Sequence, residues 1–132
     1  MSQFKIDFLK KLKALDDLKL PQNDYAITGS GPLAIRNIRQ AQDIDILVRK
    51  TLWQDLLKKY TPYDEFHMKI GVVEIWGDFI NLTPKIDQVI DESDKIEGYP
   101  FVSLESTLSW KMFLNREKDQ KDIIAIKKLL AE

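Results

Sequence analysis

Strand-like and helix-like patterns of hydrophobicity alternate along this chain, and this alternation most limits the folds that it can adopt. Short apolar or alternating runs bounded by glycine, proline and polar residues predict strands, whereas apolar residues at helical spacing predict amphipathic helices. The expected order is helix, strand, helix, strand, helix, two strands and two helices. That order predicts an α/β (α+β) fold in which helices flank a small mixed β-sheet.

Turn and cap residues set the bounds of these elements. Pro32 suits the first position of a helix that Ser30 or Gly31 caps, and Gly71 separates the two strands of a hairpin. Helices are expected at residues 4–18 (behind Ser2), 32–39, 51–60 (capped by Thr51), 104–115 and 119–130. Strands are expected at 25–28, 43–48, 66–70 and 72–76, the last one extended by 79–82, whereas 83–99 is polar and irregular.

Length and composition bound the class of protein. The 132 residues correspond to one domain over 1–132, and an apolar fraction of 44% supports a packed core. With 20 basic and 21 acidic side chains, a general polyanion-binding protein is not expected. The lack of cysteine excludes disulfides, thiolate metal sites and cysteine nucleophiles, and it suits the cytoplasm. We find neither a signal-peptide run nor a membrane-spanning apolar window, so a cytoplasmic protein is expected.

Two acids on one predicted strand give the first functional signal. Asp43 and Asp45 are separated by one residue, so on a strand both side chains point to the same face, while Ile44 and Ile46 point to the core. Like charges this close repel each other unless a cation lies between them. Carboxylate oxygens on one face suit Mg²⁺, which commonly binds one or two carboxylates together with substrate phosphates.

A glycine-rich turn precedes that strand. Gly29, Ser30 and Gly31 follow a short apolar run and open a helix, whose first N–H groups can bind an anion. The two glycines remove side chains that would block a phosphate. One half of the site would then bind phosphate and the other half metal. Both motifs also have an ordinary interpretation. The glycine-rich turn can be a simple turn, and Asp43 and Asp45 can lie on a solvated strand edge.

The order Gly-Ser, helix, acid-hydrophobic-acid-hydrophobic over residues 27–48 resembles the signature of the DNA polymerase beta-type nucleotidyltransferase superfamily, in particular its minimal and antitoxin-like members. The resemblance implies that Gly29 and Ser30 grip the triphosphate of a nucleotide. It also implies that Asp43 and Asp45 bind two divalent cations, Mg²⁺ or alternatively Mn²⁺. In this family a third acid on a later strand completes the metal site and can deprotonate the acceptor hydroxyl.

Glu74 is the candidate for that third acid, because it lies among hydrophobic residues on the predicted strand 72–76. The family more often has aspartate at this position. Asp78 shares the parity of Glu74 and replaces it if the strand continues, since periodicity does not separate the two. The ordinary alternative is a strand-edge glutamate that faces water.

The C-terminal part resembles a second motif of small nucleotidyltransferases, in which a lysine and an Arg-x-Lys-Asp sequence close one side of the nucleotide site. By this resemblance Lys111 reaches the triphosphate, and Arg116 or Lys118 adds positive charge to it. Asp119 has an ordinary role available as the cap of the last helix, with Asp122 in its first turn. The basic residues can equally form a solvated face.

Other motifs with catalytic meaning are missing from the sequence. It has neither a Gly-Lys-Ser/Thr phosphate loop nor a G-x-G-x-x-G sequence, and Ser30 is not in a G-x-S-x-G elbow. The single histidine, His67, has no second histidine with which to form a zinc site and is expected to be a surface or packing residue. The three tryptophans occupy core-like positions (Trp53, Trp76 and Trp110).

These features predict a nucleotidyltransferase that moves a nucleoside monophosphate, AMP in the first instance, from a nucleoside triphosphate to a hydroxyl acceptor and releases pyrophosphate. The acceptor belongs to a partner protein, to a small molecule or to a second copy in a homo-oligomer, because the chain has almost no room for an acceptor-recognition domain. A non-catalytic nucleotide-binding or toxin–antitoxin interaction module of the same fold is the main alternative. An α/β domain without a nucleotide site is a third hypothesis.

Overall fold

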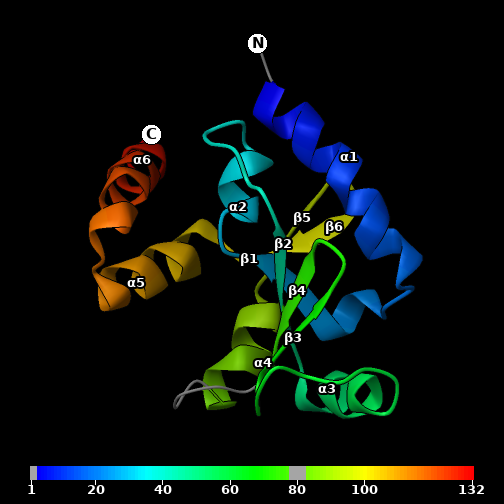
Figure 1. The fold of residues 1–132 in the computed structure, drawn as a ribbon. Coiled ribbons are helices and arrows are strands. Elements are labelled where there is room, and N and C mark those ends of the chain that lie inside the picture. The colour runs from blue at the N-terminus through cyan, green and yellow to red at the C-terminus, as the bar shows by residue number, and fades with distance from the viewer. Residues whose placement is uncertain (1–2, 78–82) are drawn as a thin grey trace.

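The fold was analysed in a computed structural model, which describes residues 3–77 and 83–132. Within them, six strands form one mixed sheet in the order β3-β4-β2-β1-β6-β5, and helices flank it (Figure 1). The mixed α/β prediction is therefore confirmed. The strands are β1 (Tyr25–Thr28), β2 (Ile44–Val48), β3 (His67–Ile70), β4 (Val73–Trp76), β5 (Asp94–Ile96) and β6 (Tyr99–Phe101). The helices are α1 (Gln3–Asp17), α2 (Gly31–Ala34), α3 (Lys50–Leu57), α4 (Thr83–Asp91), α5 (Leu104–Leu114) and α6 (Gln120–Leu130), with short 3-10 turns η1 (Gln22–Asp24) and η2 (Glu117–Asp119).

The main core lies on one face of the sheet. There α1 and α3 pack apolar side chains against β1, β2, β4 and β6, and Phe8 and Leu12 of α1 and Ile46 of β2 are almost fully buried. The opposite face carries a smaller core, in which Ile86 and Ile90 of α4 pack against Ala26 and Val102. Because successive strand residues point to opposite faces, these two cores account for the apolar positions of β1 and β2 on both faces.

Two hairpins and one central antiparallel pair organise the sheet. β1 pairs antiparallel with β2, and β2 pairs parallel with β4, so the two strands that carry the predicted acids are neighbours. β3 and β4 form the predicted hairpin at Gly71. β5 and β6 form a second hairpin, in which Glu97 and Gly98 both have positive φ, as in the tight turns that match strand twist.

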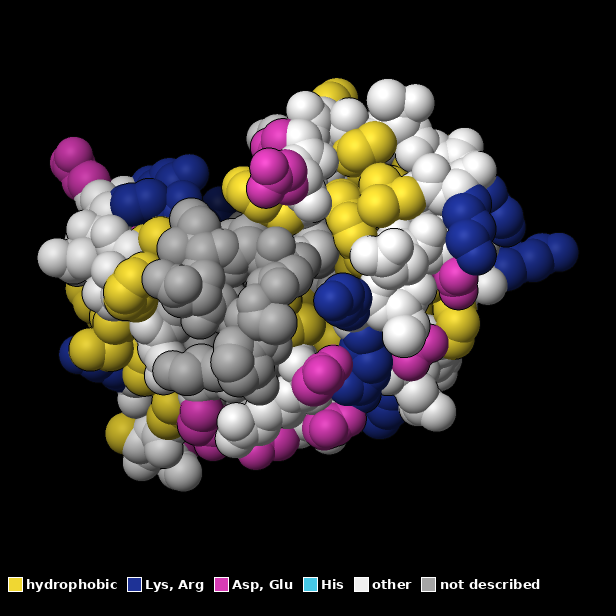
Figure 2. All heavy atoms as spheres, turned by 90° about the horizontal axis from the view of Figure 1, so that it is seen from below, with side chains coloured by type: hydrophobic (Ala, Val, Ile, Leu, Met, Phe, Trp, Pro, Cys, Tyr) yellow, Lys and Arg dark blue, Asp and Glu magenta, His cyan; other side chains and the backbone are white. Residues whose placement is uncertain are grey.

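The segment 83–99 differs from the prediction. It was expected to be irregular, but it contains α4 and β5 and enters the second hairpin. Arg49, at the end of β2, fixes α4 in place: its guanidinium forms ion pairs with Asp87 and Asp91 of that helix. Figure 2 shows the molecule from below, where basic and acidic side chains lie close to one another at several points.

The helix after β1 is shorter than predicted. It was expected over 32–39, but α2 ends at Ala34. Asn37 adopts a left-handed conformation with φ of 63°, and the N–H of Ile38 donates to the carbonyl of Leu33, which together end the helix. The N-terminal cap of α3 also differs from the prediction, because Arg49 holds that position and Thr51 lies inside the first turn. The predicted cap Ser2 and the strand extension at 79–82 lie outside the described residues.

The helix predicted over 51–60 is present as α3 but ends at Leu57, and the remaining predicted elements agree with the structure. The first helix and the last two helices are confirmed, as are the strands over 25–28, 43–48, 66–70 and 72–76, with ends that differ by one residue or less. In Figure 1, α5 and α6 lie next to each other at one side of the sheet, beyond α2. Among the described helices none is both long and apolar enough to cross a membrane.

Candidate functional site

The predicted acids of β2 and β4 meet across the pair of parallel strands. Asp45 is in register with Glu74 on one side and with Thr28 on the other, so the three side chains project from the same face of the sheet. Asp43 comes directly before β2 and lines the same region as Asp45. The structure therefore brings together Asp43, Asp45 and Glu74. Asp78, the alternative third acid, lies outside the described residues.

These carboxylates do not converge on one point. Within residues 3–77 and 83–132, no group of three or more histidine, aspartate or glutamate side chains lies close enough to hold a metal ion. Each of the two strand acids instead has a partner in the protein. Trp76 donates from Nε1 to Asp45 Oδ1 at 3.2 Å, and His67 Nε2 is in hydrogen-bond contact with Glu74 Oε1 at 2.9 Å.

His67 and Trp76 link the two carboxylates. Their rings stack with centroids 3.8 Å apart and an interplanar angle of 5°, so the contacts run from Glu74 through His67 and Trp76 to Asp45. Sequence analysis expected His67 to be a surface or packing residue and missed this role. The signal was the hairpin register set by Gly71, which pairs His67 with Trp76 and Lys69 with Glu74.

Asp45 has an altered acidity. Burial raises the pKa of its carboxyl above the ordinary value of 3.8, and the Glu74 and Asp43 carboxylates raise the pKa further. The hydrogen bond from Trp76 acts in the opposite direction and lowers this pKa. A cation placed here would lower it as well, so binding of a cation and ionisation of Asp45 would reinforce each other.

The glycines of the turn make room for protein atoms. Gly29 has φ of +67°, and a Cβ added to it would lie 2.6 Å from Asp45 Oδ2. A Cβ on Gly31 would lie 2.5 Å from Ile27 Cγ2 and 3.0 Å from Phe8 Cζ. Gly29 therefore makes room for Asp45, and Gly31 makes room for core side chains. The turn lies directly against the Asp45 carboxylate.

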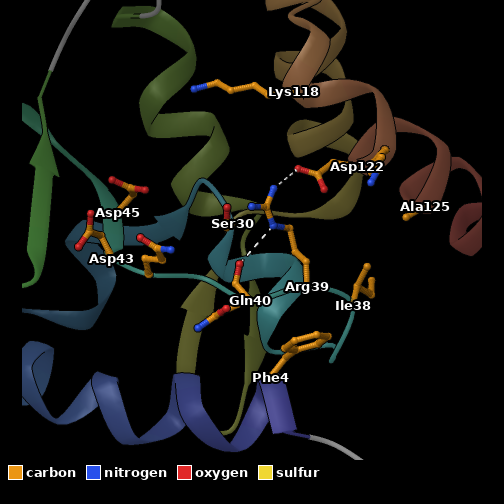
Figure 3. Close-up of a pocket in the computed structure, with 12 residues that line it drawn as sticks. Phe4, Ser30, Ile38, Arg39, Gln40, Asp43, Asp45, Lys118, Asp122 and Ala125 are labelled. Atoms are coloured by element: carbon orange, nitrogen blue, oxygen red, sulfur yellow. Dashed lines mark hydrogen bonds and ion pairs between the residues drawn. The ribbon is translucent and has the colours of Figure 1, made fainter.

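A cavity of about 900 Å³ opens beside this turn, between the 38–45 segment and α6. In Figure 3, Asp43 and Asp45 lie on one side of it, Lys118 lies on another, Ser30 lies near the centre, and Arg39 lies beyond Ser30 on the side of Asp122. Charged groups of both signs therefore face one space. The lining residues are Phe4, Ser30, Ile38, Arg39, Gln40, Gln42, Asp43, Asp45, Lys118, Lys121, Asp122 and Ala125.

The predicted basic residues of the C-terminal part are placed differently from one another. The side chain of Lys111 is 8% exposed, and its Nζ lies 3.1 Å from Asp122 Oδ2 and 3.5 Å from Asp119 Oδ1. Arg116 donates from Nε and Nη2 to the two oxygens of Asp119, at 2.7 and 3.1 Å. Lys118 lines the cavity, and so does Lys121, which sequence analysis did not single out.

Asp119 holds the N-terminal cap position of α6, as the ordinary interpretation has it, but its side chain makes no capping hydrogen bond to that helix and instead accepts from the backbone N–H of Arg116 at η2. The hydrogen bond from Arg116 is the main reason why the pKa of Asp119 is lowered, and the charge of Lys111 contributes to the shift. Asp122 also binds Arg39, whose Nη1 donates to Asp122 Oδ2 at 2.8 Å. Arg39, which sequence analysis also did not single out, therefore connects the 38–45 segment to α6 across the cavity (Figure 3).

The tryptophans differ in burial. Trp53 is buried in the main core, whereas Trp76 belongs to the site and Trp110 is half-buried and stacks on Phe113.

No family model matches the sequence, and no curated protein matches it either. The function is therefore inferred from the residues and their arrangement.

Replacing Asp45 with asparagine is expected to stabilise the fold at neutral pH. The pKa of Asp45 is raised in the folded protein, so ionisation of its carboxyl costs folding free energy. That cost is absent below the ordinary pKa and appears as pH rises through the raised value. Urea unfolding of wild type and Asp45→Asn at pH 7 and near pH 4 measures the difference.

The gain is expected at pH 7 and should shrink toward pH 4. Asp55→Asn is the matched control, because Asp55 is an exposed acid on α3 and should change stability little. A variant Asp45→Asn that is less stable than wild type at pH 7 would contradict this account of the burial of Asp45.

Proposed function

We propose that this chain is a nucleotidyltransferase: it binds a nucleoside triphosphate with divalent cations in the cavity beside α6 and transfers the nucleoside monophosphate to a hydroxyl acceptor. The observation that carries the proposal is the sharing of one cavity by Asp43, Asp45 and Ser30 with Lys118 and Lys121. Groups that bind cations thus face groups that bind anions. A metal-complexed polyphosphate carries the two complementary kinds of charge, so it fits this distribution.

The residues present fit magnesium by their chemistry. Mg²⁺ prefers carboxylate and phosphate oxygens, and the mutual repulsion that helps to raise the pKa of Asp45 is relieved by a cation. Asp43 and Asp45 would hold two Mg²⁺ ions, or alternatively Mn²⁺, and Glu74 would complete the set from the neighbouring strand. When bound, these ions supply neutralisation of the phosphate charge and a lower pKa for the acceptor hydroxyl.

The chain's own residues contribute positioning and proton transfer. Ser30 offers a hydroxyl donor to the triphosphate beside the Gly29 turn, and Lys118 and Lys121 offer positive charge across the cavity. In the transfer, the acceptor oxygen forms a bond to the α-phosphorus and the bond to the departing pyrophosphate breaks. Glu74 takes the proton of the acceptor hydroxyl as general base, with its other oxygen held by His67.

The role proposed for the C-terminal basic residues changes with the geometry. Lys111 and Arg116 are engaged in ion pairs with Asp119 and Asp122. We therefore assign them to holding α5, η2 and α6 together, and we assign phosphate binding to Lys118 and Lys121. The substrate is expected to be ATP, and the acceptor a partner protein, a small molecule or a second copy of this chain. A cytoplasmic location, where MgATP is abundant, belongs to the same proposal.

A non-catalytic nucleotide-binding or interaction module is the second candidate function. It is favoured by one specific observation: Glu74 is bound to His67, and the carboxylates of the described residues do not converge into a metal group. Catalysis requires Asp43 and Glu74 to turn toward Asp45 when the cation binds, whereas simple nucleotide binding does not. The two functions therefore differ in turnover.

Removal of the two cavity lysines tests the phosphate half of the site. Lys118→Ala/Lys121→Ala is expected to weaken binding of MgATP by about 100-fold or more, because each of the two charge-assisted hydrogen bonds contributes about 1.5–3 kcal/mol. Calorimetric titration with ATP and Mg²⁺ measures the affinity. Lys127→Ala/Lys128→Ala removes the same charge from α6 outside the cavity and serves as the control. Equal weakening by both double variants would show that only the overall charge matters.

Glu74→Gln separates the two candidate functions. The amide keeps the size of the side chain and an oxygen for His67, but it takes no proton and holds a cation weakly. Turnover, measured as pyrophosphate release with an identified acceptor, is expected to fall by roughly 10²–10⁴, while MgATP affinity changes little. Glu105→Gln, an exposed glutamate on α5, is the control. Unchanged turnover in Glu74→Gln would remove Glu74 from the mechanism, and wild-type binding without turnover on any acceptor would favour the non-catalytic module.

A further inference from the structure

The last two helices and the turn between them, α5, η2 and α6 (residues 104–130), form a unit that we call the arm. Ile123 and Ile126 of α6 are buried, yet among the described residues neither of the two cores includes a side chain from the arm. The described elements that α6 contacts extensively are α5 and η2, and Figure 1 shows the arm at one side of the sheet. The arm is therefore held together mainly by its own contacts and only weakly by the sheet.

One ion pair joins the arm to the opposite wall of the cavity. Arg39 Nη1 donates to Asp122 Oδ2 at 2.8 Å, and Figure 3 marks this contact with a dashed line. Of the ion pairs between residues that the structure describes, it alone links the arm to the preceding part of the chain. Both side chains line the cavity, so a ligand that enters it meets this ion pair directly.

Arg39 is the exposed end of a series of alternating charges, in which three cations share two anions. The order is Arg39, Asp122, Lys111, Asp119 and Arg116. The three middle side chains are at most 8% exposed, whereas that of Arg39 is 43% exposed. If Arg39 turns away, Asp122 keeps the ammonium group of Lys111 at 3.1 Å, so neither buried acid loses its last cation. Arg39 can therefore leave at a much smaller cost than Lys111.

A polyanion in the cavity offers Arg39 a second partner. Lys118 and Lys121 of the arm line the same space as Arg39. A polyphosphate between them contacts cations on both walls, so it replaces the direct ion pair with a bridge of cation, anion and cation. The Asp122 carboxylate carries the same sign of charge as the ligand, which favours its separation from Arg39. Occupancy of the cavity and the position of the arm are then coupled.

We propose that Arg39 is a clasp that the ligand operates. In the empty protein it holds the arm through Asp122, and on binding it exchanges Asp122 for a phosphate group, so that the arm shifts. This inference rests on the proposed function for the ligand and adds the residue that couples binding to a movement. The hinge lies between Val102, which belongs to the smaller core, and Ser103, whose hydroxyl accepts from the N–H of Ser106 and caps α5.

Spin labels measure this movement directly, because the chain has no cysteine of its own. Lys58→Cys at the end of α3 and Lys128→Cys on α6 carry the labels at exposed positions. Without ligand, pulsed electron paramagnetic resonance is expected to give one narrow distance distribution, which Arg39→Ala broadens and saturating MgATP shifts. Arg36→Ala is the matched control, because Arg36 pairs with Asp94 outside the arm, and it should leave the distribution unchanged.

A double-variant cycle tests the exchange of partners by calorimetric titration with MgATP. Arg39→Ala is expected to weaken binding by roughly 10- to 100-fold, as for loss of one charge-assisted hydrogen bond. Asp122→Asn is expected to strengthen binding by up to about fivefold, because Arg39 no longer has to leave a carboxylate. This gain should vanish in the Arg39→Ala background. An equal gain in both backgrounds would show that Asp122 acts only through its charge, and would overturn the exchange.

The spin-label measurement decides the proposal even if Asp122→Asn does not fold. Distances that stay unchanged in Arg39→Ala, or in wild type with MgATP bound, would overturn the clasp while the proposed function stands. Wild type that binds no MgATP in calorimetry would overturn the proposed function and the ligand-driven exchange with it. In that case a broader distribution in ligand-free Arg39→Ala would still show that Arg39 holds the arm.

Discussion

The close approach of the Gly29 backbone to the Asp45 carboxylate is the contact on which the site depends. β1 and β2 pair antiparallel, with Thr28 opposite Asp45, so the turn after β1 folds over the side chain of Asp45. With φ of +67° and Asp45 Oδ2 only 2.6 Å from where a Cβ would lie, Gly29 is required here on two grounds. The same contact puts Ser30 next to the carboxylates and so joins the two halves of the proposed ligand site.

A second set of contacts forms the opposite wall of the cavity. Lys111 is a buried lysine that forms ion pairs with the buried Asp119 and Asp122, and Arg39 connects Asp122 to the 38–45 segment. Removal of one partner from such a buried pair leaves an uncompensated charge, which typically costs about 3–5 kcal/mol. These ion pairs hold α6 in a defined position relative to the 38–45 segment, and Lys118 and Lys121 line the space between them.

Local patterns were sufficient for the strands that carry the acids, because their alternation and their bounding turns are readable without tertiary information. They were insufficient for 83–99: β5 and β6 are three residues each, and the apolar face of α4 is short and is buried only by the far side of the sheet. In the site, strand parity singled out Asp43 and Asp45, and the family resemblance singled out Glu74. The ion pairs of Lys111 were not predicted, because the local sequence around a lysine does not show whether its side chain faces a phosphate or an aspartate. His67 and Trp76 lie in the site only through the register of their hairpin.

A crystal structure of the protein with Mg²⁺ and a non-hydrolysable ATP analogue tests the central claim most directly. We expect phosphates between Ser30 and the lysines Lys118 and Lys121, and a cation bound by Asp43 and Asp45. A nucleotide bound elsewhere on the surface, or one in the cavity with no cation at Asp43 and Asp45, would contradict this claim.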